Sequence, residues 1–102
     1  MSVKKLAAIH ALASASPWSL ASFEQQLAQN GAVLIEHEHA FALGRAILDE
    51  AELLQIATHP EHQRKGLGHR VLFKFEQSAK TQGCKRAFLE VAQSNNAAIA
   101  LY

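Results

Sequence analysis

A short segment rich in glycine and basic residues has the composition of an anion-binding site. It reads Gln63-Arg64-Lys65-Gly66-Leu67-Gly68-His69-Arg70, follows an apolar run and opens the most regular helical pattern of the chain. The first turn of a helix carries free backbone N–H groups and a partial positive charge. Glycines there let a phosphate approach the backbone, and the basic side chains add positive charge. The segment indicates a pyrophosphate site, and a plain surface loop with a glycine-assisted helix start remains the alternative.

Histidine and cysteine raise the separate question of a metal site or a nucleophile. The six histidines include the pairs His37-x-His39 and His59-x-x-His62. A zinc site usually needs roughly three or four converging ligands, often with cysteine or carboxylate among them. Neither pair meets this requirement, so we expect surface histidines and no metal. Cys84 has no base next to it in the sequence, which favours a neutral thiol over a nucleophile.

The elements that must position the glycine-rich segment follow from apolar spacing and turn residues. Ser19 is a good N-cap, Ser16-Pro17 and Asn30-Gly31 are breaks, and Trp18 is expected to pack between the first two helices. In the first helix, the apolar residues Leu6, Ile9, Leu12 and Ala13 fall at helical spacing, which predicts an amphipathic helix with these residues on its apolar face. The pattern predicts helices over Val3–Ala15, Leu20–Gln29, Leu67–Gln82 and Asn95–Tyr102, and strands over Ala32–Glu36, Ala40–Leu48, Glu52–Thr58 and Arg86–Ala92.

These elements predict an α/β (α+β) fold with a mixed, mostly antiparallel sheet flanked by helices. The first three strands are expected to be antiparallel, with turns at His37-Glu38-His39 and Asp49-Glu50. The fourth strand follows a helical crossover, which normally makes it parallel to the third. The apolar residues just before Tyr102 stop in mid-pattern, so we expect further C-terminal elements, and an open sheet edge that favours self-association.

Length and composition limit the classes of protein. The 102 residues fit one domain, residues 1–102, which we expect to be incomplete, and 49% hydrophobic residues exclude a disordered chain. A net charge of +1 favours neither nucleic acid nor a membrane surface as a partner. The single cysteine and the lack of a long apolar run predict a cytoplasmic protein.

Several segments together resemble a known family. They are Pro17-Trp18-Ser19, Asp49–Ala57, His59–Gly68, Leu89-Glu90-Val91 and Ser94–Tyr102. In this order and spacing they resemble the GNAT superfamily of N-acetyltransferases, and within it the bacterial ribosomal-protein-alanine N-acetyltransferases. The resemblance covers nearly the whole chain. It implies a GNAT-like acyl-CoA N-acyltransferase fold, acetyl-CoA as cosubstrate and a protein or peptide N-terminus, that of a ribosomal protein, as acceptor.

The resemblance also implies roles for particular residues. Glu90 matches the general base, Tyr102 the general acid and Asn95 a hydrogen-bond partner of the cofactor. The chemistry is consistent, because an α-amine with a pKa of roughly 8 must lose a proton before it attacks a thioester. The cofactor is implied to contact the strand backbone at Ile56, Ala57 and Thr58 through its pantetheine arm, and to place its pyrophosphate on Gln63, Arg64, Lys65, Gly66, Leu67, Gly68 and His69.

Other interpretations of the same residues remain open. Without the resemblance, Glu90 would be read as a solvated carboxylate at a strand end and Tyr102 as an aromatic on a helix surface. Ala92 stands where the family often has arginine, which implies different contacts with the acceptor. A non-catalytic acyl-CoA-binding module and an acetyltransferase for a small amine are therefore the alternatives to N-terminal acetylation.

Overall fold

The computed structural model describes residues 3–14 and 17–89 of the chain. The predicted helix over 95–102 and the end of the last predicted strand lie outside these residues. The described helices are α1 (Val3–Ala13), α2 (Leu20–Leu27) and α3 (Leu67–Thr81), with a short 3-10 helix, η1 (Pro60–His62). The described strands are β1 (Ala32–His37), β2 (Ala40–Ile47), β3 (Glu50–Thr58) and β4 (Arg86–Leu89).

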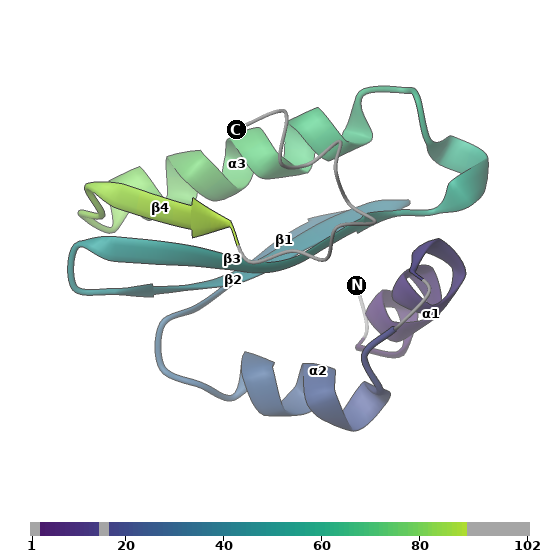
Figure 1. Ribbon diagram of the computed structural model, residues 1–102, viewed down its shortest axis with the longest axis horizontal. Coiled ribbons are helices and arrows are strands. Elements are labelled where there is room, and N and C mark those ends of the chain that lie inside the picture. Colours follow the sequence, from purple (N-terminus) through teal and green to yellow (C-terminus); the bar gives the residue numbers. More distant parts are fainter. Residues whose placement is uncertain (1–2, 15–16, 90–102) are drawn as a thin grey trace.

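The strands form one sheet in the order β1-β2-β3-β4. β1, β2 and β3 are antiparallel to their neighbours, and β4 is parallel to β3, with α3 as the connection between them (Figure 1). The predicted mixed sheet and the predicted parallel fourth strand are both confirmed. The β1–β2 turn is tighter than expected, since His37 still pairs with Ala40, and Glu50 belongs to β3 instead of a turn.

Helices cover both faces of the sheet. α3 lies on one face, while α1 and α2 lie on the other (Figure 1). Apolar side chains that alternate along the strands feed two cores, because successive residues of a strand point to opposite faces. The core under α3 includes Leu53, Val71 and Phe75, whereas the core under α1 and α2 includes Leu6, Phe23 and Phe41.

The buried stripe of α3 is the one that its sequence predicts. Leu67, Val71, Leu72, Phe75 and Ala79 are all buried. They recur at three- and four-residue spacing, which places them on one helical face. The helix ends near Gly83, whose φ of 90° is readily adopted by glycine. This helix is therefore anchored along its whole length, and its first residue is held in place.

The prediction for α1 is wrong in one respect. Leu12 is 60% exposed, whereas His10 is only 1% exposed. At 100° per residue, His10 lies on the same face as Leu6, while Leu12 points away from it. The His10 Nδ1 accepts a hydrogen bond from the backbone N–H of Trp18 at 3.0 Å, and the ring meets Phe23 edge-on at 5.5 Å. Trp18 packs on the same core, which confirms its predicted role between the two helices.

β3 contains a bulge that changes its direction before the glycine-rich segment. Leu43 pairs with Gln55 and Gly44 pairs with Leu53, which leaves Leu54 as the extra residue. Bulges of this kind bend a strand and increase its twist. A side chain at Gly44 would overlap the Glu52 carbonyl oxygen and the Phe75 ring, so α3 packs directly on the strand backbone here.

Candidate cofactor site at the start of helix α3

The end of β3 is tied to the loop that follows it. The Gln63 side chain donates a hydrogen bond from Nε2 to the carbonyl oxygen of Thr58 at 3.3 Å. Between these residues, η1 forms a single turn in which the His62 N–H donates to the His59 carbonyl at 2.8 Å. Pro60 starts this turn, as expected for a residue whose φ is already helical. The loop therefore leaves the sheet in one defined direction.

Left-handed backbone shapes the glycine-rich segment itself. Arg64 has a φ of 67° and Gly66 a φ of 79°. For arginine this conformation costs about 1–2 kcal/mol, whereas glycine adopts it readily. Strained positions of this kind concentrate at ligand sites. Apart from its chain neighbours, no described residue has an atom within 4 Å of the position that a Cβ of Gly66 would take. The left-handed conformation, and not crowding, therefore favours glycine here.

The start of α3 offers backbone donors. Gly66 is the N-cap and makes no side-chain capping bond. The first hydrogen bond of the helix runs from the Arg70 N–H to the Gly66 carbonyl at 3.0 Å. The amide N–H groups of Leu67, Gly68 and His69 lie before it and have no partner within the helix. A Cβ on Gly68 would find Thr58 Oγ1 at 4.0 Å as its nearest neighbour. Amides at a helix start have no partner in the same helix and favour a bound anion.

Positive charge surrounds these amides. Arg64, Lys65 and Arg70 are all exposed, and within the described part of the chain neither arginine forms an ion pair. Leu67 is buried in the core under α3 and holds the helix start against the sheet. The sequence prediction of an electropositive helix start after a strand is confirmed in its geometry.

His62, which the sequence offers only as a metal-ligand candidate, is a neighbour of this site. Its Nδ1 lies 3.2 Å from the Lys65 Nζ, and its ring stacks on His39 with centroids 3.5 Å apart. Desolvation lowers the pKa of His62 below its ordinary value of 6.5, and the nearby His39 and Lys65 lower it further.

The other predicted site residues divide into two groups. Ile56, Ala57 and Thr58 occupy the last part of β3, beyond the bulge, where they pair with Ala42, Phe41 and Ala40 of β2. β4 pairs with the earlier part of β3, from Glu50 to Leu53. Glu90, Asn95 and Tyr102 lie outside the described residues, so their predicted roles stay predictions.

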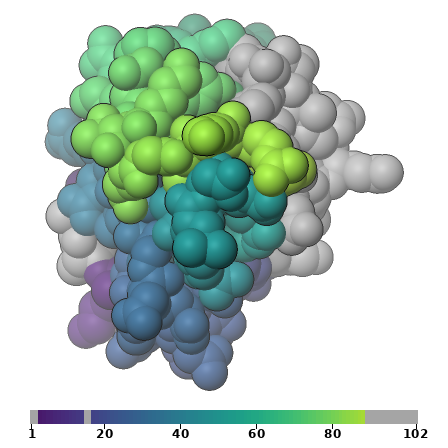
Figure 2. All heavy atoms as spheres, turned by 90° about the vertical axis from the view of Figure 1, so that its left-hand side faces the viewer, coloured from purple at the N-terminus to yellow at the C-terminus, as the bar shows by residue number. Residues whose placement is uncertain are grey.

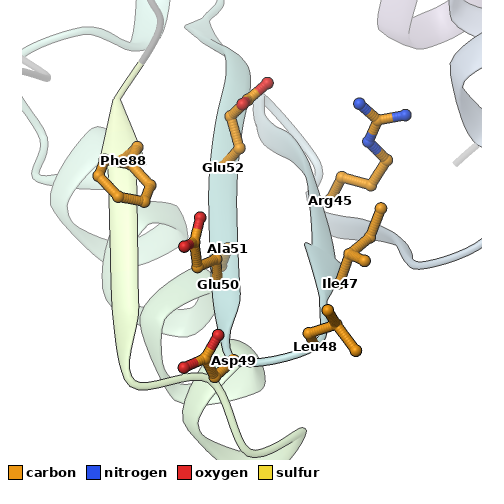
Figure 3. Close-up of a pocket in the computed structure, with 8 residues that line it drawn as sticks. All are labelled: Arg45, Ile47, Leu48, Asp49, Glu50, Ala51, Glu52 and Phe88. Carbon is orange, nitrogen blue, oxygen red and sulfur yellow. The ribbon is translucent and has the colours of Figure 1, made fainter.

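A hollow of about 280 Å³ lies at the opposite end of the sheet from the glycine-rich segment. Arg45, Glu52 and Phe88 stand side by side on β2, β3 and β4 and line it, together with Leu48 of the β2–β3 turn (Figure 3). Figure 2 faces this end, where β4 lies against the β2–β3 turn. Leu48 is 90% exposed, and its place far from the start of α3 separates this hollow from the cofactor site.

Comparison with known proteins decides the family. The model of the Acetyltransferase (GNAT) family matches residues 6–102. The chain belongs to this family. The [ribosomal protein bS18]-alanine N-acetyltransferase of Escherichia coli K12 is 40% identical over 99 residues, which cover 88% of this GNAT chain and 64% of that enzyme. The GNAT chain thus spans less than two thirds of the length of this relative.

Solved structures agree with the family in fold. The ribosomal-protein-S18-alanine N-acetyltransferase of Escherichia coli superimposes with a TM-score of 0.84 and 34% identity, covering 98% of this chain and 67% of that one. The PaiA N-acetyltransferase of Thermoplasma acidophilum, solved in complex with coenzyme A, gives a TM-score of 0.62 at 22% identity, covering 81% of this chain and 55% of that one. The second likeness supports the GNAT fold alone.

Within the described residues, no helix has both the length and the apolar composition needed to cross a membrane.

Proposed function

We propose that this protein binds acetyl-CoA at the start of α3 and transfers the acetyl group to a protein N-terminal α-amine. The observation that carries the proposal is the uncapped, electropositive helix start directly after β3, in a chain 40% identical to an enzyme named for acetylating the alanine of ribosomal protein bS18. The pyrophosphate would accept hydrogen bonds from the amides of Leu67, Gly68 and His69, with Arg64 and Lys65 beside it.

The proposed reaction is direct transfer in a ternary complex. The neutral amine attacks the thioester carbonyl carbon, a C–N bond forms, and the C–S bond breaks to release the CoA thiolate. Glu90 would take the proton that the amine must lose, and Tyr102 would supply one to the thiolate. Backbone donors beyond the bulge of β3 would stabilise the negative charge on the carbonyl oxygen. The acceptor would be an N-terminal alanine of a ribosomal protein, and the reaction would take place in the cytoplasm.

Two glycines with the same backbone conformation provide a matched test of the cofactor site. Gly66 and Gly83 have φ values of 79° and 90°, and in the described part of the chain a Cβ at either position would meet no atom within 4 Å beyond its chain neighbours. Gly66→Ala and Gly83→Ala should therefore each cost about 1–2 kcal/mol of stability. Isothermal titration of the folded proteins with acetyl-CoA should show weaker binding for Gly66→Ala only. Equal affinities in the two variants would place the pyrophosphate elsewhere.

The transfer step needs its own measurement. CoA release and mass spectrometry should be followed with peptides that begin with alanine, with the same peptides acetylated at the N-terminus, and with polyamines. Both the 102-residue chain and a version extended at its C-terminus should be used. Transfer to the free alanine peptides alone supports the proposal. Binding without transfer in both versions would favour a non-catalytic acyl-CoA-binding module, and transfer to polyamines would favour a small-amine acetyltransferase.

A further inference from the structure

Four of the six histidines gather at one place, where the β1–β2 turn meets the end of β3. We call this group the histidine cluster; it consists of His37, His39, His59 and His62. The His59 N–H donates to the His39 carbonyl at 2.8 Å, which holds the turn against the strand end. The two pairs are about twenty residues apart in the sequence. Antiparallel pairing of β2 with β3 brings them together, at Ala40 opposite Thr58.

The rings of the cluster are in contact with one another. His39 and His62 are stacked, with planes 3° apart, and the centroids of His59 and His62 are 5.6 Å apart. Glu61 adds a carboxylate from the same turn. Ligand atoms of His59, Glu61 and His62 all lie within 4.8 Å of one another.

From this geometry we propose that His59, Glu61 and His62 bind a divalent transition-metal cation, with His39 beside them as a third imidazole. Two imidazoles and one carboxylate are a donor set for Zn²⁺, Ni²⁺ and Co²⁺, whereas Mg²⁺ and Ca²⁺ prefer oxygen ligands only. Zinc bonds to nitrogen and oxygen are about 2.0–2.2 Å long, which in a tetrahedral site places ligand atoms about 3.3 Å apart. The side chains must therefore close in by about 1.5 Å at most, a rotation open to side chains at the surface.

Charge near the cluster has both signs. Glu61 and Glu38 supply negative charge, with Glu38 Oε2 3.9 Å from His39 Nε2. Lys65 is the opposing group, since its Nζ lies at 3.2 Å from His62 Nδ1. Lys65 is exposed on a flexible side chain and can turn away into solvent. Metal binding should therefore displace the Lys65 ammonium from His62.

Binding should also change the turn that carries the ligands. His59 Nδ1 accepts a hydrogen bond from the Glu61 N–H at 3.1 Å. A metal at Nδ1 takes over this lone pair, and a metal at Nε2 places the ring proton on Nδ1. In either case the hydrogen bond from the Glu61 N–H is lost, so binding of the cation would change the backbone of η1, directly before Gln63.

The test is a titration of the full 102-residue chain with Zn²⁺, followed by calorimetry, and with Co²⁺, followed by its visible absorption. Tetrahedral Co²⁺ bands should appear in the unaltered protein. His59→Gln and His62→Gln should each lower the Zn²⁺ affinity by at least about tenfold, since even partners of metal ligands are worth this much. Mg²⁺ should not compete with Zn²⁺ for the site, and its own affinity should be much lower than that of Zn²⁺. Circular dichroism melts check that the variants are folded.

Two matched controls make the result decisive. His69 is an exposed histidine of α3 outside the cluster, and Cys84 is the single thiol. His69→Gln and Cys84→Ser should keep the unaltered Zn²⁺ affinity. An equal loss in His69→Gln and His62→Gln, or a loss confined to Cys84→Ser, would overturn the proposal. So would Co²⁺ spectra of octahedral form that are unchanged in His59→Gln. Because CoA binding is not part of this readout, the result is independent of the proposed acetyl transfer.

Discussion

Gly68→Ala should raise the stability of the protein while it weakens acetyl-CoA binding. Gly68 is the second residue of α3, and among the described residues the nearest atom to an added Cβ would be the Thr58 Oγ1, at 4.0 Å. Alanine in place of glycine in a helix stabilises by roughly 0.5–1 kcal/mol. For a domain of this size, that corresponds to a rise in Tm of roughly 2–8 °C.

The expected loss of affinity comes from the direction of the new methyl group. The Cα–Cβ bond in a helix tilts toward the N-terminus, which is the side from which a pyrophosphate would approach the amides of Leu67, Gly68 and His69. A hydrogen bond to a charged group contributes about 1.5–3 kcal/mol. Loss of one such bond should weaken acetyl-CoA binding by roughly 10–100-fold.

Thermal melts and calorimetric titration of the same preparations measure both effects. Their opposite signs matter, because damage to the fold would lower stability and affinity together. Gln77→Ala, at an exposed position of the same helix, is the control and should leave the acetyl-CoA affinity unchanged. A higher Tm with unchanged affinity for acetyl-CoA would refute the placement of the pyrophosphate at this helix start. A lower Tm of Gly68→Ala would contradict the expectation that the folded protein has room for a methyl group at this position.

The remaining predictions concern stability and catalysis. Gly44→Ala should destabilise the protein by about 1–3 kcal/mol in urea unfolding, because its Cβ overlaps the Glu52 carbonyl and the Phe75 ring. Phe75→Ala should cost about 3–5 kcal/mol, since the ring is fully buried under the sheet. Desolvation lowers the pKa of His10 below its ordinary value of 6.5, although a side-chain hydrogen bond with Gln55 opposes this shift. The unfolded chain then binds more protons, so the free energy of unfolding should fall as the pH drops from about 7 to 5, and His10→Gln should flatten this slope. In an active form of the protein, Glu90→Gln should slow acetyl transfer by roughly 10²–10⁴, with partial recovery at high pH because more amine is then neutral. A rate equal to that of the unaltered protein from neutral to high pH would exclude Glu90 as the base.

Much of the fold follows from local sequence patterns. The stripe of α3 has strict helical spacing, and Ser19 caps α2 through a hydrogen bond from the Ser22 N–H to its Oγ at 3.1 Å. The parallel alignment of β4 follows from the helix between it and β3. Such features depend on periodicity and on residues next to one another, so they can be read without knowing the tertiary contacts.

The burial of His10 could not be predicted in this way. Its imidazole would be expected at the surface, but the Trp18 backbone N–H and the edges of Phe23 and Phe41 surround it. These partners come from α2 and β2 and from the segment before α2, so only the packing of the helices on the sheet supplies them. A polar ring is stable in a core when its nitrogen atoms find hydrogen-bond partners there.

The candidate cofactor site was determined largely by the sequence itself. The glycines and basic residues of one continuous segment predict a helix start that binds an anion, and the structure shows that helix start at Leu67, with Gly66 in a left-handed conformation before it. The sequence showed the two histidine pairs, but only the tertiary structure brings the pair at His37 and His39 against the pair at His59 and His62. His39 and His62 stack only because β2 and β3 pair in one register, which the bulge at Leu54 shifts by a residue. A contact between distant segments depends on that register, and local spacing carries no information about it.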